Sequence, residues 1–174
     1  MSKIGKPQPE EYANFFRGYI DMYGDQDIVE VLDTQHREYL ELLESIPDEK
    51  MTYAYAEDKW TIAEVLGHVN DVERVMGYRA FRFSRYDKTV IPGFNDHFYV
   101  DNGDFAKRPK RTFLREFDGL RMANLEMIYN LSESQSMNTG KANDVFFSVR
   151  ALTYIIAGHL GHHINILKDR YDIK

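Results

Sequence analysis

Four stretches of this sequence place apolar residues at the three- and four-residue spacing of an amphipathic helix, and none alternates as a strand does. They cover residues 27–46, 61–84, 110–131 and 148 onwards. A shorter amphipathic segment at residues 10–23 comes first and ends at Gly24. Helices joined by irregular loops predict an all-α fold, here a four-helix bundle with a short extra N-terminal helix.

The second stretch has the clearest helix start. Thr61 and Glu64 stand three residues apart, which predicts a capping box, and Trp60 and Val65 flank them as a hydrophobic staple. The apolar face that follows contains His68. The pattern therefore predicts a helix that presents one histidine to the interior of the bundle.

A long connection, residues 85–109, joins the second and third predicted helices. Connections of this length inside one domain are uncommon and are often functional. Its ring side chains include Phe94, His97, Phe98, Tyr99 and Phe105. They either anchor the loop to the bundle or cover a ligand, and the sequence leaves both interpretations open.

The composition excludes several classes of protein. With 174 residues, 43% hydrophobic and 29% charged, the chain is expected to form one globular domain. The net charge is −6 and the basic run at residues 107–111 is short, so we expect no nucleic-acid partner. The absence of cysteine excludes disulfides, thiolate ligands and a cysteine nucleophile, so any thiol must come from a substrate.

No segment of the sequence predicts export or membrane insertion. The lysines of residues 1–6 have no apolar stretch behind them, and no apolar run approaches the ~20 residues that span a bilayer. We expect a cytoplasmic protein without a membrane partner. It would consist of an N-terminal extension with a short helix, residues 1–24, and a bundle domain, residues 25–174.

Three histidines are the candidate metal ligands. His159 and His163 stand one helical turn apart on an apolar face, with Cβ atoms ~5–6 Å apart, close enough to hold one ion. Taken alone, this pair is about as consistent with two structural histidines as with two metal ligands. His68 favours the metal, because three inward-facing imidazoles from two helices are costly to bury unless they share a partner. Three nitrogens with an open fourth position are typical of a catalytic site.

The other histidines are expected to have other roles. His162 points about 100° away from His163, so it is predicted to lie behind the ligands or at the surface, with a ligand role as the alternative. His36 is predicted to be buried and satisfied by hydrogen bonds. His97, in the long loop, could approach the metal, but the sequence does not fix its position.

Four side chains near the histidines bear on the chemistry that the site can perform. Leu160 stands where a zincin helix carries its general-base glutamate, which excludes that peptidase mechanism. Glu64 is occupied by capping. Asp71, one turn after His68, is a candidate to orient that ring, and Glu73 is predicted on the flank in salt bridges with neighbouring arginines. No catalytic base can be named from the sequence.

These motifs resemble the DinB-like superfamily, close to its YfiT group. Residues 60–74 are similar to its second-helix signature, and residues 155–163 to the last-helix motif that supplies two ligands. Residues 92–94 and 148–151 match the landmarks between them. The resemblance spans about residues 25–171. One departure is Asn95, where many relatives carry an acidic residue.

The resemblance implies a four-helix bundle, a divalent metal held by His68, His159 and His163, and frequent homodimers. Zinc or nickel is the expected ion, with manganese or iron as alternatives. Family members include transferases for small thiols such as bacillithiol or mycothiol, a thiol-dependent isomerase, and proteins labelled as metal-dependent hydrolases.

We therefore expect an enzyme whose metal activates a small thiol or water, for transfer to an electrophile or for hydrolysis. The alternative is a non-enzymatic, metal-stabilised binding or stress-response module. Because imidazole binds metal only when neutral, the ordinary histidine pKa predicts that metal affinity falls from about pH 7 towards pH 5.

Overall fold

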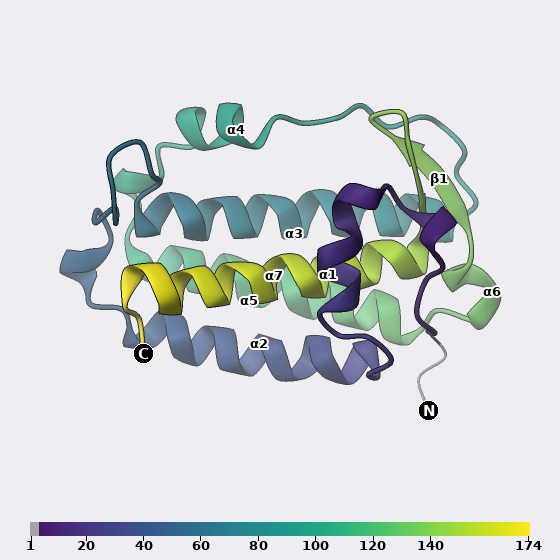
Figure 1. Cartoon of the computed structure of the whole chain (residues 1–174), viewed down its shortest axis with the longest axis horizontal. Coiled ribbons are helices and arrows are strands. Elements are labelled where there is room, and N and C mark those ends of the chain that lie inside the picture. The colour runs from purple at the N-terminus through teal and green to yellow at the C-terminus, as the bar shows by residue number, and fades with distance from the viewer. Residues whose placement is uncertain (1–3) are drawn as a thin grey trace.

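The computed structural model describes residues 4–174 and shows a bundle of four long helices (Figure 1). They are α2 (Ile28–Ser45), α3 (Ile62–Ser84), α5 (Lys110–Tyr129) and α7 (Val149–Tyr171). The predicted four-helix bundle is confirmed, and each helix begins within two residues of the position expected from the sequence. Residues 1–3 of the predicted N-terminal extension lie outside the described residues.

The helix starts follow from capping side chains. Asp27 accepts hydrogen bonds from the backbone N–H groups of Val29 and Glu30 at the start of α2. In the capping box of α3, the Thr61 hydroxyl accepts from the N–H of Glu64, and the Glu64 carboxylate accepts from the N–H of Thr61 at 2.7 Å. Such caps stabilise a helix end by about 1 kcal/mol. The predicted start of the His68 helix is therefore confirmed.

The main helix pairings are α3 with α7, α3 with α5, α2 with α5, and α2 with α7. Helices α3 and α5 run in the same direction, so their connection must return along the length of the bundle (Figure 1). That return path explains why the connection is long. It lies over α3, next to the face that carries His68.

The returning connection is partly helical. It contains α4 (Asp96–Asn102), capped by the Asn95 side chain, and a 3-10 turn at Phe105–Lys107. Phe105 is buried and anchors the connection, whereas Phe98 is exposed. Phe94 packs against the core and also lines a cavity. Phe105 and Phe94 therefore anchor the loop to the bundle, and the cavity position of Phe94 leaves a role in covering a ligand as a prediction.

The N-terminal segment is less regular than the sequence predicts. In place of one helix over residues 10–23, it forms 3-10 turns at Pro9–Glu11 and Asn14–Phe16, followed by the short α1 (Arg17–Asp21). The extended backbone at Tyr12 and Ala13 separates them. So short a helix gains its stability from packing.

Packing of α1 depends on glycine in α7. A Cβ on Gly158 would lie 2.4–2.6 Å from Tyr19 atoms, its backbone included, so only glycine permits this approach. The N-terminal segment is thereby held against the helix that carries His159.

A small antiparallel hairpin corrects the expectation of a chain without strands. Strands β1 (Thr139–Ala142) and β2 (Val145–Ser148) pair with Thr139 opposite Ser148, and they follow the short α6 (Glu133–Ser136). Asn143 and Asp144 form the turn with φ of 52° and 58°, the backbone that a tight hairpin requires. Strand β2 begins with three consecutive apolar residues, so alternation of apolar and polar residues does not identify it.

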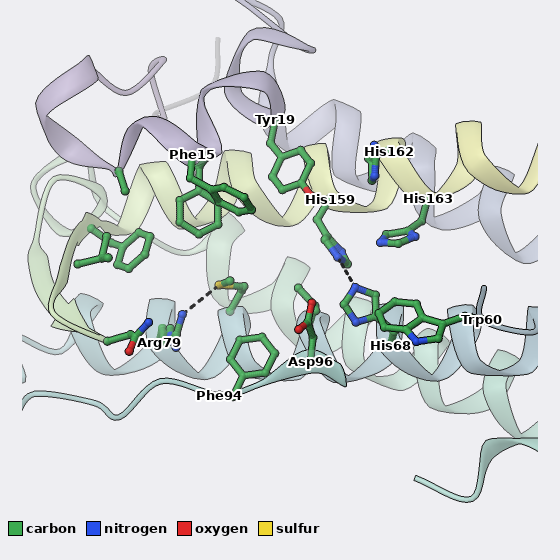
Figure 2. A pocket seen from close by; sticks show the side chains of 17 residues that line it. Phe15, Tyr19, Trp60, His68, Arg79, Phe94, Asp96, His159, His162 and His163 are labelled. Carbon is green, nitrogen blue, oxygen red and sulfur yellow. Dashed lines mark hydrogen bonds between the residues drawn. The ribbon is translucent and has the colours of Figure 1, made fainter. Parts of the chain in front are cut away.

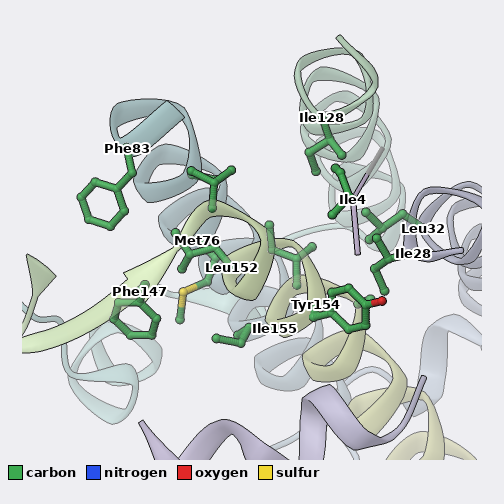
Figure 3. Packing of buried hydrophobic residues seen from close by; sticks show 14 of the residues in the cluster. Ile4, Ile28, Leu32, Met76, Phe83, Ile128, Phe147, Leu152, Tyr154 and Ile155 are labelled. Atoms are coloured by element: carbon green, nitrogen blue, oxygen red, sulfur yellow. The ribbon is translucent and has the colours of Figure 1, made fainter. Parts of the chain in front are cut away.

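The core consists of two clusters of buried apolar side chains, and each includes residues of all four long helices. The first lies at the hairpin end and joins residues of the N-terminal segment, all four long helices and β2, among them Ile4, Leu32, Met76, Ile128, Phe147 and Ile155 (Figure 3). The second lies towards the C-terminus and includes Tyr39, Leu66, Phe113 and Leu160. Within residues 4–174, no helix combines the length and hydropathy that crossing a membrane requires.

Candidate metal centre

His68, His159 and His163 come together between α3 and α7, where the two core clusters meet. Each offers one ring nitrogen, and these three atoms lie within 4.8 Å of one another. The side chains are only 6–8% exposed. Figure 2 shows the three rings facing each other across the gap between the helices. The structure thus brings together the three predicted histidines.

The spacing of the rings fits a shared cation. The Nε2 atoms of His68 and His159 lie 2.9 Å apart. Two nitrogens bound tetrahedrally to one zinc ion at ~2.0–2.1 Å would lie about 3.3 Å apart, so a small adjustment suffices. Nδ1 of His163 is buried and has no hydrogen-bond partner within residues 4–174, and coordination by this nitrogen would satisfy it.

The electrostatics of the cluster favour neutral imidazoles, the form that binds metal. Burial lowers the pKa of His68 to about 4, against the opposing effect of the Asp96 charge. Burial, with the charge of His68 as a further cause, lowers the pKa of His163 to about 3. The pKa of His159 also lies well below its ordinary value because of burial and the two neighbouring rings. All three rings are therefore neutral at pH 7 and can accept a cation.

Aromatic side chains surround the cluster. The Trp60 ring packs on His68 with 4.8 Å between centroids, and Tyr19 meets His159 edge-on at 5.9 Å. Trp60 is fixed in turn by its backbone carbonyl, which accepts a hydrogen bond from the Tyr171 hydroxyl at 2.6 Å. Rings on both sides limit the access of water and hold the imidazoles in place.

The remaining histidines behave largely as predicted. His162 is exposed and lies outside the group of three, although its ring contacts Tyr19 and lines the cavity next to them. His36 is buried, and its Nε2 lies 2.8 Å from the Asp118 carboxylate, which confirms the predicted hydrogen-bonded role. His97 is exposed on α4 and packs against Trp60 at 5.1 Å. It therefore contacts an aromatic neighbour of the cluster and is not one of the three histidines that form it.

Of two predictions about carboxylates, the one for Asp71 is wrong, and the one for Glu73 is right about a salt bridge with an arginine but wrong about its position on the flank. Asp71 accepts a hydrogen bond from Arg74 and makes none with His68. Side chains on a helix lean towards its N-terminus, so the His68 ring points away from the turn that carries Asp71. Glu73 is only 3% exposed and lies inside the bundle, where both its oxygens accept from Arg121 of α5 at 2.8–2.9 Å.

A cavity of about 500 Å³ opens onto the three histidines. Its other walls come from the N-terminal segment, α3, the returning connection and the hairpin, including Phe15, Tyr19, Met76, Arg79, Phe94 and Phe147 (Figure 2). Asp96, at the start of α4, also lines it, and its charge acts on His68. Sequence reasoning missed Asp96 and Arg79. Only the expectation of an acidic residue at the neighbouring Asn95 pointed to this part of the loop.

Comparisons with known proteins agree with this architecture. A family model described as the DinB superfamily matches residues 32–167, well over half of the chain. No curated protein matches this chain. Among solved structures, the fold is similar to YfiT from Bacillus subtilis, with a TM-score of 0.75 over 99% of this chain and 98% of that chain, at 16% identity. That protein is described as a probable metal-dependent hydrolase with an unusual four-helix bundle topology.

Proposed function

The chain belongs to the DinB superfamily, and from this we propose that it is a metal-dependent enzyme in which His68, His159 and His163 hold one divalent ion. Neutral imidazoles suit zinc or nickel, with manganese or iron as alternatives. The proposed reaction is transfer of a small thiol to an electrophilic small molecule, or hydrolysis of such a molecule. The observation that carries the proposal is the position of three buried imidazoles at the wall of an open cavity.

Two features support an enzyme over a metal-stabilised module. Within residues 4–174, no cysteine or carboxylate joins the three histidines as a fourth ligand. The cavity provides room for a substrate beside them. Three protein ligands and an accessible position are typical of catalytic metal sites, whereas structural sites are closed by four.

The ion would supply a Lewis acid that makes a thiol or a water nucleophilic near neutral pH. The three histidines would hold it as neutral donors, and Trp60 and Tyr19 would keep bulk water from their rings. A thiol must come from a cosubstrate because the chain has no cysteine. The 16% identity to YfiT does not choose between thiol transfer and hydrolysis.

Asp96 is our candidate for the proton acceptor. Its carboxylate lines the same cavity, and its charge acts on His68. One oxygen accepts from the backbone N–H of His97 at 2.9 Å, which fixes the side chain at the start of α4. A carboxylate held beside the nucleophile can take up its proton, a contribution of typically 10²–10⁴-fold in rate.

The partners we propose are a small thiol and an electrophile, and a second copy of the chain in a homodimer. Light scattering should give twice the 20.5 kDa mass of the chain. A monomer mass over a wide concentration range would reject the dimer and leave the metal site untouched.

The experiment that tests the function begins with elemental analysis of protein purified without added metal. We expect about one divalent ion per chain in the wild type, a sharp loss in His159→Ala, and no loss in His36→Ala, which removes a histidine outside the cluster. The loaded protein is then screened for thiol conjugation and for hydrolysis. Full metal occupancy in His159→Ala would reject the site, and inactivity of the loaded protein in both screens would favour a non-enzymatic module.

A further inference from the structure

Arg79 is a buried cation without a carboxylate partner. Its side chain is 4% exposed, Nε is buried with no hydrogen-bond partner, and Nη1 donates only to the Met76 sulfur at 3.6 Å. No ion pair within residues 4–174 includes it. By contrast Arg121, the other buried arginine, donates to both oxygens of Glu73. A buried guanidinium normally requires such a partner, so its absence at Arg79 needs an explanation.

The rings around Arg79 do not supply that partner. Its guanidinium carbon lies 5.6 Å from the centre of the Phe94 ring and 5.9 Å from that of Phe147. These contacts favour a cation, but aromatic carbons offer no lone pair to the N–H donors. The fork of donors is therefore held in place by two rings and left available to the cavity that Arg79 lines.

Arg79 and His68 lie on the same face of α3. The residues of α3 that line the cavity are His68, Val72, Met76 and Arg79, spaced by four, four and three. Eleven residues correspond to ~16 Å along a helix axis and to about three full turns. The Arg79 side chain leans towards Met76, as helical side chains do, which shortens this span. The cavity thus has the histidines at one end and a cation at the other.

The wall between the two ends is apolar. Val72, Met76, Phe94 and Phe147 line it. The carboxylate of Asp96 lies at the histidine end. In the metal-free cavity, a ligand with one anionic group would therefore be repelled at the Asp96 end and attracted at the Arg79 end. With the proposed ion in place the histidine end also attracts anions, so the reacting group would take that end and Arg79 would hold a second anionic group at the remote end.

We propose that Arg79 is the specificity residue of this cavity and that the substrate is an elongated small molecule with a carboxylate at the end remote from the histidines. The carboxylate accepts hydrogen bonds from the guanidinium fork, a geometry that suits arginine. An apolar middle section lies along Met76 and between Phe94 and Phe147. Only the part of this inference that places the reacting end of the substrate at the histidines rests on the proposed function.

The test compares the binding of phenylbutyrate with that of its neutral amide, phenylbutyramide, by titration calorimetry. Metal-free protein is used first, so that no ion can bind the carboxylate. The wild type should bind the acid at least about tenfold more tightly than the amide, the range expected for hydrogen bonds to a charged group. Arg79→Met should remove this preference. Arg85→Met, which removes an exposed arginine at the end of the same helix, should retain it.

Equal affinity of the wild type for acid and amide, or no binding of the acid at millimolar concentration, would overturn the proposal. So would a preference for the acid that persists in Arg79→Met. If that variant does not fold, Arg79→Lys replaces it and should show a reduced preference, because the charge remains and the fork is lost. Repetition with zinc separates the two proposals. Failure to bind zinc would reject the proposed function and leave the acid preference intact.

Discussion

The Nε2 atoms of His68 and His159 lie 2.9 Å apart, one on α3 and the other on α7. Two neutral imidazoles can approach so closely only if one of these nitrogens carries the hydrogen and the other accepts it. A shared cation would remove that requirement. It would also join two helices that the chain separates by 91 residues.

Metal should therefore stabilise the bundle. An ion that binds only the folded state adds about 2.7 kcal/mol at a free concentration of 100 Kd, which corresponds to roughly 5–10 °C in Tm for a domain of this size. Calorimetry with chelator and with added zinc measures the shift. His163→Ala should lose most of it and His36→Ala none. An unchanged Tm in the wild type would contradict the metal site.

The second prediction concerns Asp96. Replacement of Asp96 by Asn should lower the rate of the detected thiol transfer or hydrolysis by about 10²-fold or more, because the proton acceptor is lost. Metal content should stay unchanged, since Asp96 is not among the three grouped side chains. Asp101→Asn removes an exposed carboxylate from the same short helix and should retain the rate. Equal rates for both variants would exclude the role of Asp96.

The positions of the three proposed metal ligands could be predicted because they depend on local rules. Thr61 and Glu64 fix the start of α3, so helical periodicity then places His68 on the buried face. The same periodicity places His159 and His163 on one side of α7. The resemblance to a known family added the expectation that the two faces meet.

The rest of the site depends on the path of the chain between helices. Asp96 lines the same cavity as His68 because the connection returns over α3, and Ile91 holds that path by pairing with the hairpin through hydrogen bonds of 3.0 Å to Lys141 and Asn143. No periodicity in the sequence encodes such contacts. Glu73 was misplaced for a similar reason, since only the pairing of α3 with α5 brings Arg121 opposite it.

That buried pair leads to the third prediction. Glu73→Leu should lower the free energy of unfolding by about 3–5 kcal/mol, because Arg121 is left as an uncompensated buried charge. The double variant with Arg121→Met should recover much of the loss. Asp33→Ala, which removes an exposed pair with Arg37, should cost less than about 1 kcal/mol. Urea denaturation measures all three. A double variant no more stable than Glu73→Leu would contradict this account.

The last prediction concerns pH. In the unfolded chain the three ligand histidines titrate near the ordinary pKa of about 6.5. In the folded chain burial lowers the pKa of His68 to about 4 and that of His163 to about 3, and the pKa of His159 is lowered as well. Below pH 6.5 the unfolded state therefore binds more protons than the folded state, so the free energy of unfolding of the metal-free protein should fall as the pH drops.

The same pKa shifts change the pH range over which protons compete with metal for the three histidines. From the ordinary histidine pKa, the sequence predicts that metal affinity is lost between about pH 7 and 5. With the folded-state pKa of His68 at about 4, protons compete with metal in the folded protein only below about pH 5. Zinc titrations of the folded protein should give a nearly constant affinity from about pH 7 to 5.

Over the same range, urea denaturation of the metal-free protein should show stability falling, by up to about 1.4 kcal/mol per pH unit for each group. His163→Leu should reduce that slope by one group's share, since it removes one of the three imidazoles. A metal-free protein equally stable at both ends of this range would show that the histidines are not buried as neutral bases, and the proposed metal site would lose its electrostatic basis.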